Sequence, residues 1–112
     1  MASSVRAAYS RRVIAHLRAD LPDLAADHSD ASLQALIAEA AALGDRCAMT
    51  TEHDVFWLVL FRLCLGPGFE HSTEHPWIGA ILADPDMPGG VKALQIRTRL
   101  TAVTEQEPAY GH

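Results

Sequence analysis

Residues 55–65 read VFWLVLFRLCL, and the turn-forming sequence Gly-Pro-Gly follows them at residues 66–68. Arg62 is the one charged residue of this run, so a helix formed by it is apolar on nearly every side. Such a helix must be covered by other parts of the protein or by a partner. We therefore predict that Thr51–Leu65 is the central helix of the fold. Leu60, in the middle of the run, is predicted to lie in the packed interior.

The rest of the chain also favours helices. Of its 112 residues, 49% are hydrophobic, and many of these are Ala and Leu, which suit helices better than strands. Apolar residues recur at spacings of three and four in four further segments, roughly 4–21, 30–43, 76–84 and 88–104. We predict an all-α, single-domain bundle of about five helices over residues 1–104. Residues 105–112 include a proline and a glycine and are predicted to form a mobile tail.

Two connections are predicted from their residue types. Residues 22–30 are predicted to form an acidic loop, and either Ser29 or Asp30 then caps the second helix. That helix is predicted to end at Leu43, with Gly44 in the left-handed conformation that commonly terminates helices.

The charge of the chain bears on its partners. The net charge of −5 argues against a nucleic-acid-binding surface, because contacts with phosphates are made by clusters of Lys and Arg. The N-terminal segment is an exception, since four arginines precede the first acidic residue, Asp20. We interpret this basic segment as a solvated helix face or as a contact with an acidic protein, in preference to an RNA site.

The sequence predicts a cytoplasmic protein with no membrane partner. The apolar run is about half as long as the ~20 residues that span a bilayer. Met1 is followed by Ser and Arg residues and not by the apolar core of a secretory signal. Cys47 and Cys64 lack the CxxC spacing, and Cys64, inside the apolar run, is expected to be a buried free thiol.

The histidines raise a metal hypothesis. His71 and His75 are four residues apart, as ligands on one helical face are, and His53 could supply a third ligand. The pair lies between a glycine turn and Pro76, however, where a helix is not expected, and a polar surface loop is the favoured interpretation. The sequence has no nucleophile elbow and no phosphate-binding glycine loop, so we predict a non-enzyme without metal or cofactor. A metal protein or enzyme using the His71/His75 loop remains the minor alternative.

The aromatic residues of the chain are either core or partner anchors. Trp and Arg are enriched where protein interfaces are strongest, and a small protein has little mass with which to cover an all-apolar helix. We therefore place a predicted partner-binding surface at five residues: Phe69, Pro76, Trp77, Trp57 and Arg62. The partner is predicted to be another protein, and a homodimer is possible.

A short pattern resembles a group of small helical bacterial proteins. It consists of Leu65-Gly66-Pro67-x-Phe69, an acidic loop, and then Pro76-Trp77 with Ile81-Leu82. Genes of that group tend to accompany type VI secretion effectors and the adaptor-chaperones that load them. The resemblance implies a non-catalytic accessory, acting as a co-chaperone or adaptor partner in effector loading, or an immunity protein that neutralises a cognate toxin. In this chain the loop carries His71 and His75 where the group is richer in Asp.

Overall fold

The chain is all-helical in a computed structural model that describes residues 2–106, and this confirms the predicted fold class. The described residues contain no strand. Their elements are α1 (Ala2–Asp20), α2 (Pro22–Ala25), α3 (Asp30–Cys47), α4 (Glu52–Leu65), the 3-10 turn η1 (Phe69–His71), α5 (Pro76–Ala83) and α6 (Gly89–Gln106). The single turn α2 lies inside the segment predicted as a loop, and α6 extends two residues into the predicted tail. Residues 107–112 lie outside the described part, and the prediction of a mobile tail therefore concerns mainly residues that are not described.

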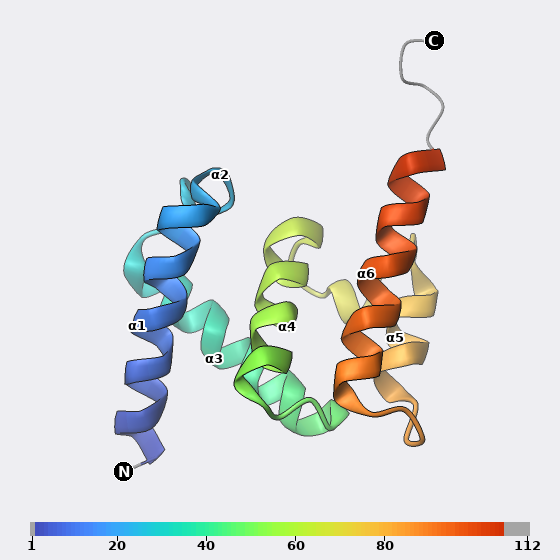
Figure 1. The fold of residues 1–112 in the computed structure, drawn as a ribbon, viewed down its shortest axis with the longest axis horizontal. Helices are drawn as coiled ribbons and strands as arrows, with labels where there is room; N and C mark the ends of the chain where they lie inside the picture. Colours follow the sequence, from blue (N-terminus) through green and yellow to red (C-terminus); the bar gives the residue numbers. More distant parts are fainter. Residues whose placement is uncertain (1, 107–112) are drawn as a thin grey trace, which may run out of the picture.

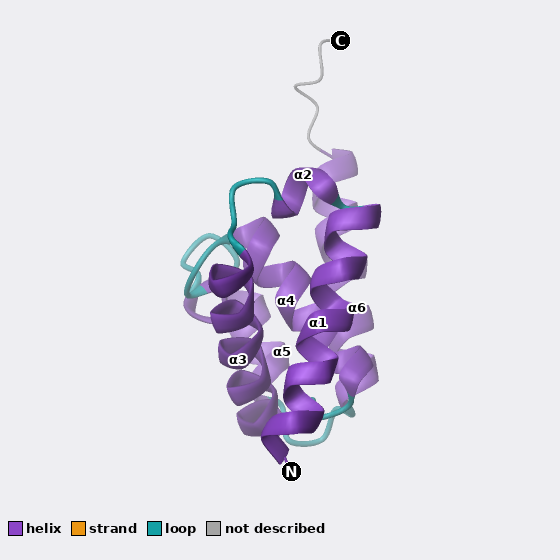
Figure 2. Cartoon of the chain, turned by 90° about the vertical axis from the view of Figure 1, so that its left-hand side faces the viewer, coloured by secondary structure: helices purple, strands orange, loops and turns teal. Residues whose placement is uncertain are grey.

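Helix α4 lies in the middle of the molecule, between α1 on one side and α6 with α5 on the other (Figure 1). Helix α3 crosses behind α4 and makes with it the most extensive helix contact of the fold. The view turned by 90° shows α1 and α3 next to each other, with α4 behind them (Figure 2). The predicted central helix is therefore found where it was expected.

Side-chain caps fix the starts of α3 and α4. Ser29 Oγ accepts a hydrogen bond from the Ser32 backbone N–H at 3.1 Å, so Ser29, and not Asp30, is the cap of α3. Thr51 Oγ1 accepts from the Asp54 N–H at 3.0 Å in the same way. Each cap satisfies one of the N–H groups that a helix N-terminus leaves without a partner.

The predicted end of α3 at Leu43 is wrong. The helix continues to Cys47, and Ala48 adopts the left-handed conformation, with φ of 59°. Gly44 is a helical, buried residue whose place would not admit a side chain: a Cβ there would collide with the Met49 carbonyl oxygen and lie 3.4 Å from Leu58 Cδ1. Glycine is required at this position for close approach of the chain, and not for a positive φ.

The core lies between α3 and the inner face of α4. Val55, Leu58, Val59 and Phe61 of α4 are each no more than 7% exposed. They belong to one apolar cluster with residues of α1, α3, α5 and α6, among them Leu17, Leu33, Leu36, Ile37, Ile78, Leu82 and Ile96.

A buried lysine joins the ends of three helices. Lys92 of α6 is 2% exposed, and its Nζ donates to the carbonyl oxygens of Cys47, at 2.6 Å, and Leu82, at 2.8 Å. These carbonyls belong to the last turns of α3 and α5, where backbone oxygens lack helical partners and a cation is favoured. The contact fixes the N-terminal part of α6 against the rest of the bundle.

None of the described helices combines the length and the hydropathy that crossing a bilayer requires.

Candidate functional site: a partly covered apolar strip on α4

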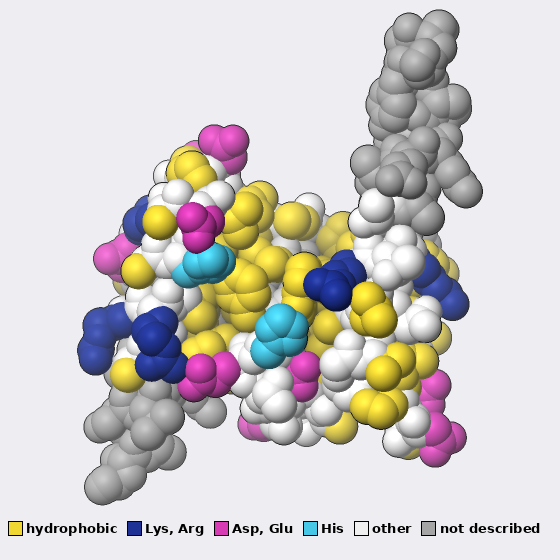
Figure 3. Space-filling model, viewed as in Figure 1, with side chains coloured by type: hydrophobic (Ala, Val, Ile, Leu, Met, Phe, Trp, Pro, Cys, Tyr) yellow, Lys and Arg dark blue, Asp and Glu magenta, His cyan; other side chains and the backbone are white. Residues whose placement is uncertain are grey.

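The outer face of α4 is apolar but only partly covered. Five of its residues, which we call the α4 strip, are half-buried or exposed: Phe56, Trp57, Leu60, Leu63 and Cys64. Residues 56, 60 and 63 recur at the spacing of one helical face, and residues 57 and 64 lie beside them. The space-filling view shows apolar side chains gathered in the hollow between α1 and α6, where α4 reaches the surface (Figure 3).

Helix α1 forms one wall of this hollow and is fixed to the beginning of α4. The Tyr9 hydroxyl donates to the Glu52 carbonyl oxygen at 2.8 Å, and the Arg12 guanidinium pairs with the Glu52 carboxylate at 2.9 Å. The His16 ring contacts the Phe56 ring edge-on, with 5.3 Å between centroids. Burial, reinforced by the neighbouring Glu52 carboxylate, raises the pKa of Tyr9 to about 12. Together with Val13 these residues line an open hollow of about 450 Å³.

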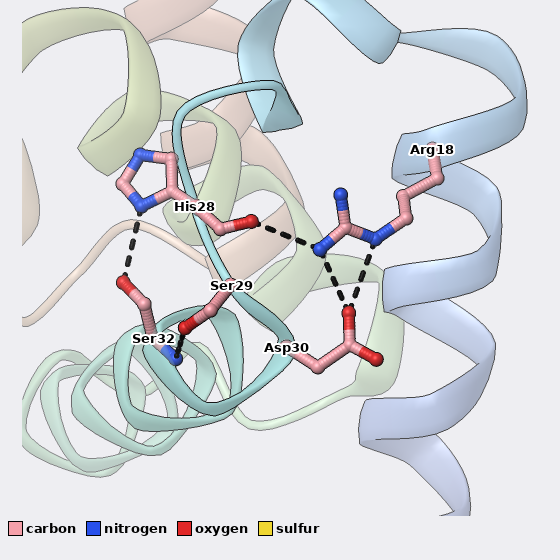
Figure 4. Close-up of polar contacts among 5 residues, drawn as sticks. All are labelled: Arg18, His28, Ser29, Asp30 and Ser32. Carbon is pink, nitrogen blue, oxygen red and sulfur yellow. Dashed lines mark hydrogen bonds and ion pairs between the residues drawn. The ribbon is translucent and has the colours of Figure 1, made fainter.

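The C-terminal end of α1 is fixed to the start of α3 (Figure 4). The Arg18 guanidinium donates to Asp30 Oδ1 through two nitrogens, at 2.7 and 3.1 Å, and to the His28 carbonyl oxygen at 2.9 Å. Ser32 of the same region contacts His28 Nδ1 through its hydroxyl at 3.2 Å. Helix α1 is thus held at its middle, through Tyr9 and Arg12, and near its C-terminal end, through Arg18, and it lies as a wall beside the α4 strip.

Helix α6 forms the other wall through a stacked arginine. The Arg97 guanidinium carbon lies 4.5 Å from the centroid of the Trp57 ring, a cation–π geometry. The Trp57 indole N–H donates to His53 Nε2 at 3.1 Å, so the tryptophan is oriented from both sides. This arrangement places a positive charge directly at the edge of the apolar strip.

Of the predicted contact residues, Trp57 lies in the strip and Phe69 does not. Phe69 is 4% exposed and packs its ring against Phe61, with 6.1 Å between centroids. Its assignment to a partner surface is therefore wrong, because a side chain buried in the core cannot reach a partner. The prediction that Leu60 lies in the packed interior is also wrong, since Leu60 is a half-buried member of the strip.

The other three predicted contact residues lie apart from the strip. Arg62 projects from the α3 side of α4, 3.6 Å from Glu39, and lines a separate cavity of about 230 Å³. Pro76 is exposed and Trp77 half-buried on α5, with the Arg99 guanidinium 5.6 Å from the Trp77 ring centroid. The structure therefore does not bring the five predicted residues together into one surface.

The histidine loop offers no assembled metal site. No group of three His, Cys, Asp or Glu side chains that could hold a metal ion occurs among the described residues. His71 ends the 3-10 turn with its side chain 84% exposed, and its nearest acidic partner is Glu70 at 4.0 Å. The His75 ring instead contacts Trp77, with 5.9 Å between centroids. His71 and His75 do not share an α-helix, so their four-residue spacing does not place them on one helical face.

Both cysteines are free thiols, and they lie in different parts of the molecule. Cys64 is exposed on the α4 strip, so its expected burial is wrong. Cys47 lies at the end of α3 and lines a hollow with Glu70 and Leu82. Burial raises the pKa of both thiols. Cys64 is therefore a neutral thiol at neutral pH and adds to the apolar character of the strip.

Sequence reasoning missed Arg97 and His16, which border the strip. The sequence contains a second basic pair, Arg97 and Arg99, in addition to the arginines of α1. Only the fold shows that Arg97 lies on Trp57 of α4 and that His16 lies against Phe56. No family model, no curated protein and no solved structure matches the chain.

Proposed function

We propose that this chain is a non-catalytic accessory that binds another protein through the α4 strip. The observation that carries the proposal is the apolar outer face of α4, which the neighbouring helices cover only in part. Soluble monomers rarely expose a contiguous apolar patch without a use, and such patches are typical of protein contact sites. Aromatic side chains such as Phe56 and Trp57 are the residue types that contribute most to binding energy at interfaces.

The setting we propose is the one implied by the resemblance at residues 65–82: a co-chaperone or adaptor partner in the loading of a type VI secretion effector. An immunity protein that occludes a cognate toxin is the second candidate. It is favoured by the acidic character of the chain outside α1 and α6, since an acidic surface suits a basic nuclease. The localisation consistent with either role is cytoplasmic.

The two thiols provide a test of the contact surface within one molecule. The purified protein is mixed with each protein encoded beside its gene, and alkylation of Cys64 and Cys47 is followed by mass spectrometry. Binding at the strip should slow alkylation of Cys64 severalfold and leave Cys47 unchanged. A bound partner that protects Cys47 and not Cys64 contradicts the proposed surface, and the identity of the partner separates the adaptor role from the immunity role.

A charge placed in the strip should abolish the same binding. Leu60→Glu inserts a carboxylate at the centre of the strip, whereas Ala38→Glu places the same group on the exposed side of α3 as a control. Isothermal titration should show loss of partner binding for the first variant only. If Leu60→Glu fails to fold, Cys64→Glu provides the same test at an exposed position. Unchanged binding in these folded variants contradicts the proposal.

A further inference from the structure

A second concave site lies on the side of α4 that faces α3, away from the α4 strip. It is a cavity of about 230 Å³ between α3, the C-terminal half of α4 and the 3-10 turn η1. Its floor belongs to the core, since Leu58 and Phe69 are at most 4% exposed and Leu43 beside them is buried as well. An apolar lining with a few convergent polar groups is typical of cavities that bind small molecules.

Two oppositely charged residues line this cavity and are largely withdrawn from solvent. The side chain of Arg62 is 24% exposed and that of Glu70 is 22% exposed. Within residues 8–101, whose side chains are described, neither side chain forms a hydrogen bond, and the two do not pair with each other. Because desolvated charges are costly unless they are hydrogen-bonded, both groups gain from a ligand that supplies the missing partners.

The nearest charges of the protein do not supply those partners. Glu39 lies 3.6 Å from the Arg62 guanidinium, too far for a hydrogen bond, and its side chain is 63% exposed. The partner nearest to Glu70 is the exposed His71, at 4.0 Å. Exposed ion pairs of this kind contribute little. Arg46, one helical turn beyond Leu43 on α3, adds a second cation to the lining and forms no ion pair among the described residues.

We infer that this cavity binds a free α-amino acid with an apolar side chain. The carboxylate of the ligand accepts hydrogen bonds from the Arg62 guanidinium, its ammonium group donates to the Glu70 carboxylate, and its side chain packs on the apolar floor. Two arginines and two glutamates line the cavity, so the lining is neutral as a whole and suits a zwitterion. A volume of about 230 Å³ is that of about seven water molecules, which suits a ligand smaller than a drug. The inference is independent of the proposed function, because the cavity shares no lining residue with the α4 strip.

Other ligands use only part of this lining. A peptide C-terminus has the carboxylate without the neighbouring ammonium group, and a peptide N-terminus has only the ammonium group. Inorganic phosphate pairs with arginine but leaves Glu70 and the apolar floor without a partner. A free amino acid carries both charges and the apolar group on neighbouring atoms, and it therefore satisfies Arg62 and Glu70 together.

A ligand series on the unaltered protein tests the inference by two-dimensional NMR titration. L-Valine, L-leucine and L-phenylalanine sample the size of the side chain, and at least one of them should shift the Gly68 and Leu43 amide signals saturably while the Trp57 indole signal stays in place. N-Acetyl and amide derivatives of the best ligand lack the ammonium group and the carboxylate respectively, and each should bind at least about tenfold more weakly. The inference is overturned if either derivative binds as tightly as the parent amino acid, or if none of the three saturates up to about 10 mM.

Two variants and a matched control assign the binding to this cavity. Arg62→Met removes the guanidinium and keeps an apolar side chain of similar reach, and Glu70→Gln removes the negative charge. Each should weaken binding of the amino acid by at least about tenfold, whereas Arg97→Met, the same change on α6, should leave it unchanged. Unchanged affinity in both cavity variants, or an equal loss in Arg97→Met, overturns the inference. If Arg62→Met fails to fold, Glu70→Gln and the ligand series on the unaltered protein still decide it.

Discussion

Helix α4 turns one apolar face toward α3 and a second apolar face outward between α1 and α6. On the inner face Leu58 and Val59 are fully buried, whereas on the outer face Leu60 is half-buried and Cys64 is exposed. Both faces are built mainly of apolar side chains, so composition alone does not explain the difference. The position of the neighbours does: α1 and α6 pack at the edges of the outer face, and no described element crosses it.

The largest expected difference between the two faces is in stability. Leu58→Ala should lower the free energy of unfolding by about 2–5 kcal/mol, because it leaves a cavity in a packed interior. Leu60→Ala removes the same atoms from a partly solvated site and should cost about 1 kcal/mol or less. Urea denaturation of the two variants measures both values. Equal losses would show that the outer face is as tightly packed as the inner one.

The inner face also depends on a close contact with α3. Gly44→Ala would place a Cβ against the Met49 carbonyl oxygen and beside Leu58, and overpacking of this kind costs about 1–3 kcal/mol. Gly90→Ala is the control, since a Cβ at that position in α6 meets no atom within 4 Å. It should stabilise the protein by about 0.4–1 kcal/mol. Thermal unfolding should therefore show shifts of opposite sign, and a stabilising Gly44→Ala would contradict the close approach.

The sequence predicts the helical class, the start of α4 and the caps because each depends on local residue types. It does not separate Leu58 from Leu60, since an uninterrupted apolar run has no amphipathic period from which an inner face can be read. The sequence predicts a positive φ at Gly44 because residue type alone does not distinguish a glycine that ends a helix from one that a neighbouring segment approaches closely. Phe69 follows a Gly-Pro-Gly turn that suggests a surface, and only the fold shows its ring against Phe61.

A smaller effect is expected at the histidine loop, which lies outside both faces of α4. His71→Ala should change the free energy of unfolding by less than about 0.5 kcal/mol, because the side chain is 84% exposed. The midpoint of thermal unfolding should match that of the parent protein with and without added Zn²⁺. A zinc-dependent rise that disappears in His71→Ala would revive the metal alternative.

The smallest effect concerns Tyr9, which joins α1 to the outer side of α4. In the unfolded chain a tyrosine ionises near pH 10, whereas in the folded protein the pKa of Tyr9 is about 12. The neutral phenol is therefore favoured by folding, and this contribution to stability is complete below pH 10 and is lost as the pH rises from 10 to 12. Tyr9→Phe lacks the titrating group, so its free energy of unfolding should fall less steeply over that interval. Urea denaturation of both proteins at pH 9 and pH 11 measures the difference, and the groups that the two chains share cancel in the comparison. Parallel losses would mean that Tyr9 is solvated and that α1 does not close on Glu52.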